Sequence, residues 1–216
     1  MVPGMNKMIQ EPQTRKPTDV RKREIIDAAL GILAHNGARS FTAKNIAAEV
    51  GITSGAIFRH FESMEAIVVD VVAQIEATTS QDFPLGIEDP LERLKIFFLN
   101  RTRTILTHPN ISRLLLSDHL DQVGGGVAAK TLTNIKSRTR KFIDSCIVET
   151  AQALPSGPDT GARVDTDVAR IIVIGAILSM SHSNTRVVSE TKSPQLAASV
   201  WRVIEQMLRI PRPPSK

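Results

Sequence analysis

The sequence contains a single cysteine, Cys146, no tyrosine and one tryptophan among its 216 residues. One cysteine excludes an intramolecular disulfide and favours a reducing compartment. The longest apolar run, at residues 168–180, is interrupted by Arg170 and is shorter than the roughly 20 residues of a membrane-spanning helix. The first ten residues lack the apolar segment of a signal peptide. We therefore expect a soluble, cytoplasmic protein.

The motifs of common catalytic and metal sites are absent as well. The sequence has no HExxH, CxxC, GxSxG or GxGxxG, and the glycines at 124–126 lack the Lys-Ser/Thr ending of a phosphate loop. Among the histidines, His119 with Asp118 and Asp121 comes nearest to a metal cluster, but such close neighbours do not share a helix face. We predict no enzymatic activity, no cofactor and no metal.

Strand patterns are nearly absent, whereas apolar residues recur at helical spacing along most of the chain. We expect an all-α fold of about nine helices, with the first at 18–35 and two short ones within 42–62. The remaining helices are predicted at 63–80, 89–107, 110–122, 127–154, 165–187 and 193–209. The expected parts are a disordered basic arm at 1–18, a three-helix head at 19–62, a larger helical body at 63–210 and a flexible tail at 211–216.

Helix starts are predicted from side chains that can accept a hydrogen bond from the first free backbone N–H groups. The predicted N-caps are Thr18 or Asp19, Thr42, Thr53 or Ser54, Ser63 and Asp89. Asp89 is followed by Pro90 and Glu92, which together complete a strong start signal. Gly51 stands where a left-handed residue would end the second helix.

The stretch at 40–64 organises the head. Its first helix presents Ile46, Ala47 and Val50 on one face, and its second helix has the apolar side Ile57, Phe58 and Phe61. The residues left facing outward are Ser54, Gly55, Ala56, Arg59 and His60. Small residues let a short helix approach a duplex closely, so the spacing predicts a helix-turn-helix whose second helix enters a major groove. An ordinary helix corner within a core is the alternative.

The positive charge is concentrated around this segment. Residues 1–60 contain nine Lys and Arg against five Asp and Glu, a net charge of +4, whereas residues 61–216 contain eighteen against seventeen. A basic surface around a reading helix is the electrostatic pattern expected of a DNA-binding protein, although the same charge could only maintain solubility. The basic arm could likewise follow a groove or remain a free terminus.

The run TAKNIAAEVGITSGAIFRHFES resembles the DNA-binding signature of TetR/AcrR-type transcriptional regulators, and the resemblance covers about residues 21–72. If the segment reads DNA in this way, we expect Lys44, Thr42, Thr53 and the basic arm to neutralise phosphates. The outward residues of the second helix would approach bases or the adjoining backbone, and Phe58 would pack near a thymine methyl or a sugar. The chain departs from the family at two phosphate-contacting positions. Phe58 replaces a usual tyrosine and Met64 a usual lysine.

The resemblance also implies a mostly apolar ligand pocket in the body, for a small effector that releases DNA. The candidate lining residues are Phe97, Phe98, Arg101, Leu115, His119, Phe142, Cys146, Ile177 and Met180. Each could equally be part of the core. Arg101, on an apolar face, requires a partner, which could be an acidic ligand, Asp118 or Asp144, or it could reach solvent.

The helix expected at 165–187 is apolar nearly all round, which is difficult to satisfy in a small monomer. With the helix at 193–209 it predicts a four-helix contact in a homodimer. We therefore expect a ligand-responsive regulator, most simply a repressor, that binds a near-palindromic DNA operator as a dimer. The alternatives are an architectural DNA-binding protein without an effector, and a ligand carrier or enzyme whose head docks proteins.

Overall fold

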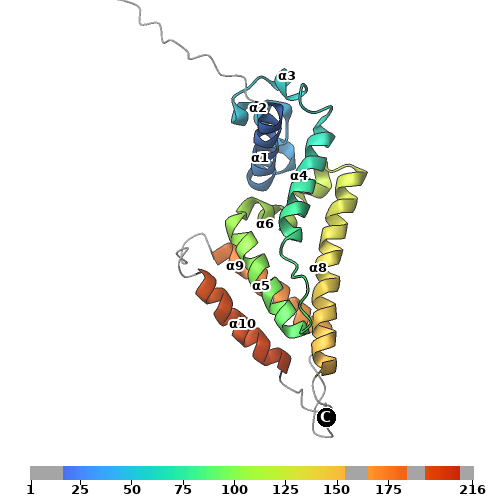
Figure 1. Ribbon diagram of the computed structural model, residues 1–216. Coiled ribbons are helices and arrows are strands. Elements are labelled where there is room, and N and C mark those ends of the chain that lie inside the picture. Colours follow the sequence, from blue (N-terminus) through green and yellow to red (C-terminus); the bar gives the residue numbers. More distant parts are fainter. Residues whose placement is uncertain (1–16, 154–164, 184–192, 210–216) are drawn as a thin grey trace, which may run out of the picture.

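The computed structural model describes residues 17–153, 165–183 and 193–209, and every regular element in these ranges is helical (Figure 1). The elements are α1 (Thr18–Asn36), the short 3-10 helix η1 (Ala38–Ser40), α2 (Ala43–Val50), α3 (Ser54–Ile57), α4 (Met64–Ser80), α5 (Pro90–Thr107), α6 (Pro109–Leu116), α7 (His119–Val123), α8 (Gly126–Ala153), α9 (Thr166–Ser183) and α10 (Ser193–Arg209). The all-α prediction is confirmed. Three predicted parts lie outside the described residues: the arm apart from its last two residues, the tail, and the end of the helix at 165–187.

The helices form an elongated molecule with α1, α2 and α3 at one end (Figure 1). One hydrophobic core joins this head to α4, α6, α7 and the first half of α8. A second core joins α5, α9, α10 and the later part of α8. The head therefore shares its core with the body, and α8 contributes buried residues to both cores.

Three of the predicted N-caps are confirmed. The side chain of Thr42 accepts a hydrogen bond from the backbone N–H of Asn45, Ser63 accepts one from Ala66, and Asp89 accepts two at the start of α5. The prediction for α1 is wrong, because the helix already includes Thr18 and its N-cap position is Pro17, which has no side-chain oxygen. The first residues of α1 are exposed, so water can satisfy their free backbone N–H groups in place of a side-chain cap.

The single helix predicted at 110–122 is wrong, because the chain breaks at Ser117 and Asp118 into α6 and α7. Ser117 is extended, with φ −97° and ψ 167°, and its N–H bonds back to the carbonyl of Arg113 at 3.0 Å. The break allows both Leu114 and Leu120 to enter the core shared with the head. In one continuous helix Leu114 and Leu120 would lie on different faces, so both could not point toward α1.

Candidate nucleic-acid interface and ligand cavity

A tight turn joins α2 to α3. Gly51 ends α2 in the left-handed region, with φ 73° and ψ 36°, as the sequence predicts. The N–H of Ile52 then donates to the carbonyl of Ala47 at 2.9 Å. Because a side chain at Gly51 would be strained in this conformation, glycine is what allows α3 to start so soon after α2.

α3 is shorter than the sequence predicts, with only four residues, and Thr53 at its start makes no side-chain cap hydrogen bond. The chain continues as turns in which the N–H groups of Arg59 and His60 bond to the carbonyls of Ala56 and Ile57 at 3.2 and 2.9 Å. The assignment of Phe58 to the apolar side is wrong. Its side chain is 49% exposed, because the turns place only Ile57 and Phe61 in the core.

Most of the predicted DNA contacts lie on the surface of the head. The exposed residues are Thr42, Lys44, Thr53, Ser54, Gly55, Phe58 and Arg59, while Ala56 and His60 are partly buried. A Cβ added to Gly55 would meet nothing within 4 Å, so the start of α3 is open to a close approach. The Nδ1 of His60 is buried without a hydrogen-bond partner, so that face of the imidazole is turned away from solvent.

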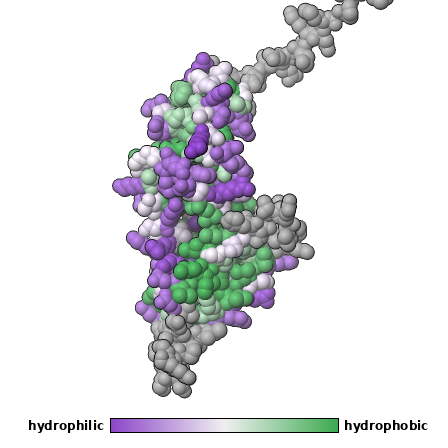
Figure 2. Space-filling model, turned by 180° about the vertical axis from the view of Figure 1, so that it is seen from behind, coloured by the Kyte–Doolittle hydropathy of each residue, from purple (hydrophilic) through white to green (hydrophobic). Residues whose placement is uncertain are grey.

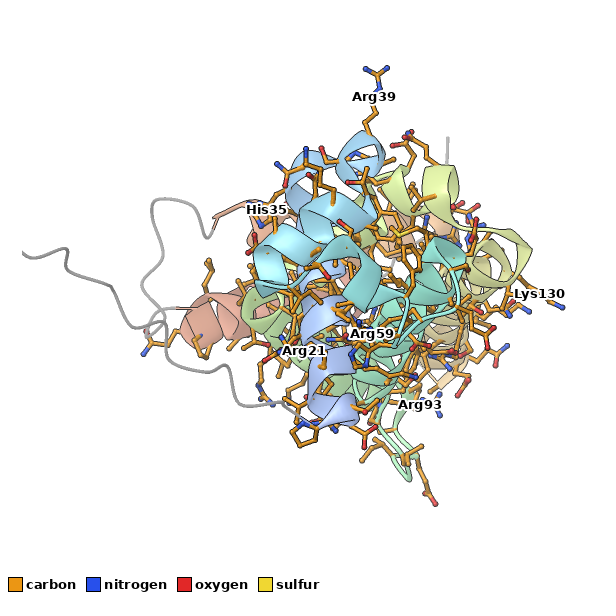
Figure 3. The ribbon with its side chains drawn as sticks, turned by 90° about the horizontal axis from the view of Figure 1, so that it is seen from above. Arg21, His35, Arg39, Arg59, Arg93 and Lys130 are labelled. Atoms are coloured by element: carbon orange, nitrogen blue, oxygen red, sulfur yellow. The ribbon has the colours of Figure 1, made fainter. Side chains whose placement is uncertain are left out.

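Arg39 is a cation of the head that is not among the predicted DNA contacts. It is exposed in η1, its side chain extends outward from the ribbon, and η1 itself contacts α7 (Figure 3). Arg21, in contrast, is engaged with Glu24 at 2.7 Å. In the sequence, Arg39 stands three residues before the Thr42 N-cap. This nearness to the helix-turn-helix is the signal that could have made it a candidate DNA contact.

Two histidines lie between the head and the body. His35, near the end of α1, is 2.9 Å from the Oδ1 of Asn110 and also takes a hydrogen bond from Arg113. His119, at the start of α7, has its Nδ1 3.0 Å from the carbonyl oxygen of Leu33. The structure therefore places His119, predicted as a pocket residue, against α1. These contacts attach the end of α1 to α6 and α7.

Arg101 is buried and paired inside the body. Its Nε lies 2.6 Å from the Oδ2 of Asp82, and Nη2 donates to the carbonyl of Thr79 at 3.1 Å. Burial lowers the pKa of Arg101 and raises the pKa of Asp82, against the attraction between the two charges. The two carboxylates considered in the sequence analysis are not the partners. Asp144 pairs instead with Arg170, at 2.7 Å.

A cavity of about 190 Å³ lies among α5, α6, α8 and α9. It is lined by Arg101, Ile105, Ser112, Leu115, Leu116, Ile135, Lys136, Thr139, Arg140, Ile143, Ile174, Ile177 and Leu178. The predicted residues Arg101, Leu115 and Ile177 are among them. The others apart from His119 pack in the second core: Phe97, Phe98, Phe142, Cys146 and Met180.

A wider groove of about 740 Å³ adjoins the cavity between α8 and α9. It shares four lining residues with the cavity, namely Lys136, Arg140, Ile174 and Leu178, and adds Thr133, Ser137, Arg170, Ile171 and Gly175. Lys136 and Arg140 are not among the predicted pocket residues. Their signal in the sequence is a pair of cations four residues apart on a helix that also carries buried residues.

Within the described ranges, no three His, Cys, Asp or Glu side chains come close enough to hold a metal ion. None of the helices in those ranges combines the length and apolar character needed to cross a bilayer. The structure thus has a head that exposes Lys44 and Arg59, an apolar cavity, and a groove lined by cations. α6 contacts α1 of the head and also lines the cavity.

Known proteins resemble this chain in sequence and in fold. Residues 25–71 match the family described as bacterial regulatory proteins, tetR family. The chain is similar to the uncharacterized HTH-type transcriptional regulator TtgW of Pseudomonas putida, with 30% identity over 105 residues that cover 48% of this chain and 78% of that protein. It is 28% identical over 114 residues to the HTH-type transcriptional regulator SrpR of the same species, covering 52% of this chain and 53% of SrpR.

The chain thus spans about half the length of SrpR. Its fold is similar to that of the ketosteroid transcriptional regulator KstR2 of Mycobacterium tuberculosis, with a TM-score of 0.69 and 19% identity over 86% of this chain and 93% of that one. The match to TtgW, the match of the head to the family and the common fold agree with the helix-turn-helix described above. The chain belongs to the TetR family of bacterial regulatory proteins.

Proposed function

We propose that the protein is a transcriptional repressor that binds a near-palindromic operator as a homodimer and is released by a small, mostly apolar effector. The observation that carries this proposal is the group of exposed residues at α3, namely Thr53, Ser54, Gly55, Phe58 and Arg59. The division into a head at 19–62 and a body at 63–210 is part of the proposal, since the effector and the DNA would act on different parts.

In this account Thr42, Lys44 and Thr53 bind phosphates. Ser54, Gly55, Ala56, Arg59 and His60 approach the bases, and Phe58 lies against a thymine methyl group or a sugar. The N-terminal residues of a recognition helix are those that reach base edges in the major groove. Two heads related by a two-fold axis would read half-sites about one helical turn apart.

An exposed apolar surface on α9 and α10 supports the dimer. It consists of Val168, Ile171, Ile172, Leu196 and Val203. Figure 2 shows hydrophobic residues gathered over the lower half of this side of the molecule, whereas the head above is mixed in character. Apolar patches of this kind on soluble proteins mark interaction sites, and two antiparallel helix pairs packing on each other form a common dimer interface.

α6 supports a link between effector and DNA, because it lies at both sites. Ser112, Leu115 and Leu116 line the cavity, while Asn110 and Arg113 hold His35 of α1. A molecule that fits only one position of α6 would favour one position of the head. The effector then releases DNA by shifting the population of head positions, without touching the DNA.

The test is selection of bound duplexes from a random pool by the full-length protein at near-physiological salt. We expect an enriched near-palindrome whose binding is lost with Arg59→Ala and weakened with Lys44→Ala. The matched control is Lys130→Ala, which removes an exposed cation from α8, on the side of the molecule (Figure 3). A pool without enrichment, or equal losses in all three variants, would contradict sequence-specific recognition.

A further inference from the structure

The cavity and its groove are lined by four cations, and only two of them are neutralised. Arg101 is paired with Asp82, and Arg170 is paired with Asp144 and Asp167. For Lys136 and Arg140, no carboxylate in the described part of the chain lies within ion-pair distance. Of the four cations, these two are also the ones that line both the cavity and the groove.

Lys136 and Arg140 stand four residues apart on α8 and so share one face of the helix. Like charges at this spacing repel each other and weaken the helix unless an anion lies between them. Exposed cations are usually solvated, but these two border an apolar surface formed by Ile174 and Leu178 of α9. A group that neutralises both charges would at the same time cover that surface.

The buried part of the cavity lining has the opposite character. It consists mainly of aliphatic side chains, among them Ile105, Ile143 and Ile177. The one cation among these buried lining residues, Arg101, already has its carboxylate. A second charge placed there would lose its hydration without gaining a partner, which is costly. The buried part of the cavity therefore favours a neutral, apolar group.

We infer that the body binds an amphipathic anion whose apolar part fills the cavity and whose carboxylate or phosphate lies between Lys136 and Arg140 in the groove. An engineered cavity of about 150 Å³ accepts a benzene molecule. A cavity of about 190 Å³ thus suits an apolar body slightly larger than benzene, such as a medium-length acyl chain. This inference rests on the proposed function, because it names the class of the effector.

The experiment is titration calorimetry of the full-length protein with octanoate, octanoyl-CoA and the neutral 1-octanol. We expect the protein to bind at least one of the two anions. The double variant Lys136→Ala/Arg140→Ala should weaken that binding about fivefold or more, since each exposed ion pair contributes modestly. It should leave the binding of 1-octanol unchanged. Loss with octanoate assigns the subsite to a carboxylate, and loss with octanoyl-CoA alone assigns it to phosphates.

The matched control is Lys130→Ala/Lys141→Ala, which removes two exposed cations of the same helix that line neither hollow. It should bind all three probes as the original chain does. The exchange Lys136→Arg/Arg140→Lys keeps both charges and should change anion affinity by less than about twofold. Circular dichroism verifies that each variant is folded.

Equal anion affinity in the original chain and the Lys136→Ala/Arg140→Ala variant would overturn the subsite, as would the absence of binding of both anions. Operator binding is measured on the same proteins without probe. Intact operator binding with no anion binding would contradict the subsite and leave the repressor proposal standing. Anion binding by a protein that selects no operator would support the subsite and contradict the repressor proposal.

Discussion

The Nε atom of Arg101 lies 2.6 Å from the Oδ2 atom of Asp82, and the two side chains are only 6% and 4% exposed. Thr104 donates a further hydrogen bond to the Oδ1 of Asp82 at 2.6 Å. The pair joins the segment that follows α4 to the middle of α5, beside the cavity. A buried pair of this kind is stable only while both charges are present, because a single charge left in the interior has no compensation.

Asp82→Ala should therefore lower the free energy of unfolding by about 3–5 kcal/mol. The measurement is urea denaturation followed by circular dichroism. The control is Asp121→Ala, which removes an exposed carboxylate and should change stability by less than about 0.5 kcal/mol. Equal effects of the two substitutions would mean that the Arg101–Asp82 pair makes no specific contribution to the free energy of unfolding.

Cys146 is completely buried, and burial is the main cause that raises the pKa of its thiol. The unfolded chain loses this proton at about pH 8.5, while the folded chain still retains it. The folded state then binds more protons, so the free energy of unfolding should fall as the pH rises above that value. Below it the contribution is constant.

We expect stability to decrease more between about pH 7.5 and about pH 9.5 in the original chain than in Cys146→Ala, which lacks the titrating group. Thermal unfolding at the two pH values measures the difference. A thiol reagent should also react slowly with the native protein and rapidly after denaturation, because the reactive species is the thiolate. The same pH dependence with and without Cys146 would be inconsistent with a raised thiol pKa.

The proposed dimer can be tested with two valines of equal exposure. Val203 on α10 and Val127 on α8 are both 66% exposed, but only Val203 belongs to the apolar surface on α9 and α10. A glutamate at a dimer interface would be buried without a partner. Val203→Glu should therefore give a folded monomer by sedimentation equilibrium, whereas Val127→Glu should leave the association unchanged. A dimer that survives Val203→Glu would place the interface elsewhere.

Phe58 offers a gain-of-binding test. The family usually carries a tyrosine here, whose hydroxyl contacts a phosphate, and the Phe58 side chain is exposed. Phe58→Tyr should strengthen operator binding by about 0.5–1.5 kcal/mol, the value of one added hydrogen bond. Fluorescence anisotropy with the selected duplex measures it. Unchanged affinity would mean that this side chain does not face the backbone in the complex.

The parts of the fold that depend on neighbouring residues were predictable from the sequence. The caps at Thr42, Ser63 and Asp89 and the left-handed Gly51 are local features, since each needs only the next few residues. The resemblance of residues 21–72 to TetR-type regulators also predicted the family and the candidate DNA contacts. The exposure of Phe58 was not predictable from helical spacing, because the chain leaves the helix at that residue.

The features that depend on distant contacts were not predictable. The break between α6 and α7 follows from packing against α1, and the pairing of Arg101 joins two segments 19 residues apart in sequence. The ligand residues illustrate the same limit, because Phe97 and Leu115 look alike in a helical pattern. Only the packing distinguishes a side chain that fills the core from one that borders a cavity.

The central claim is that the head reads DNA sequence, and the most direct measurement compares the affinity for the selected operator with that for a scrambled duplex. We expect a preference of about 10³-fold or more at near-physiological salt. Arg59→Ala should reduce this preference, whereas Lys44→Ala should weaken both duplexes equally and lower the salt slope by about 0.9. Equal affinity for the two duplexes, unchanged by either substitution, would contradict the account.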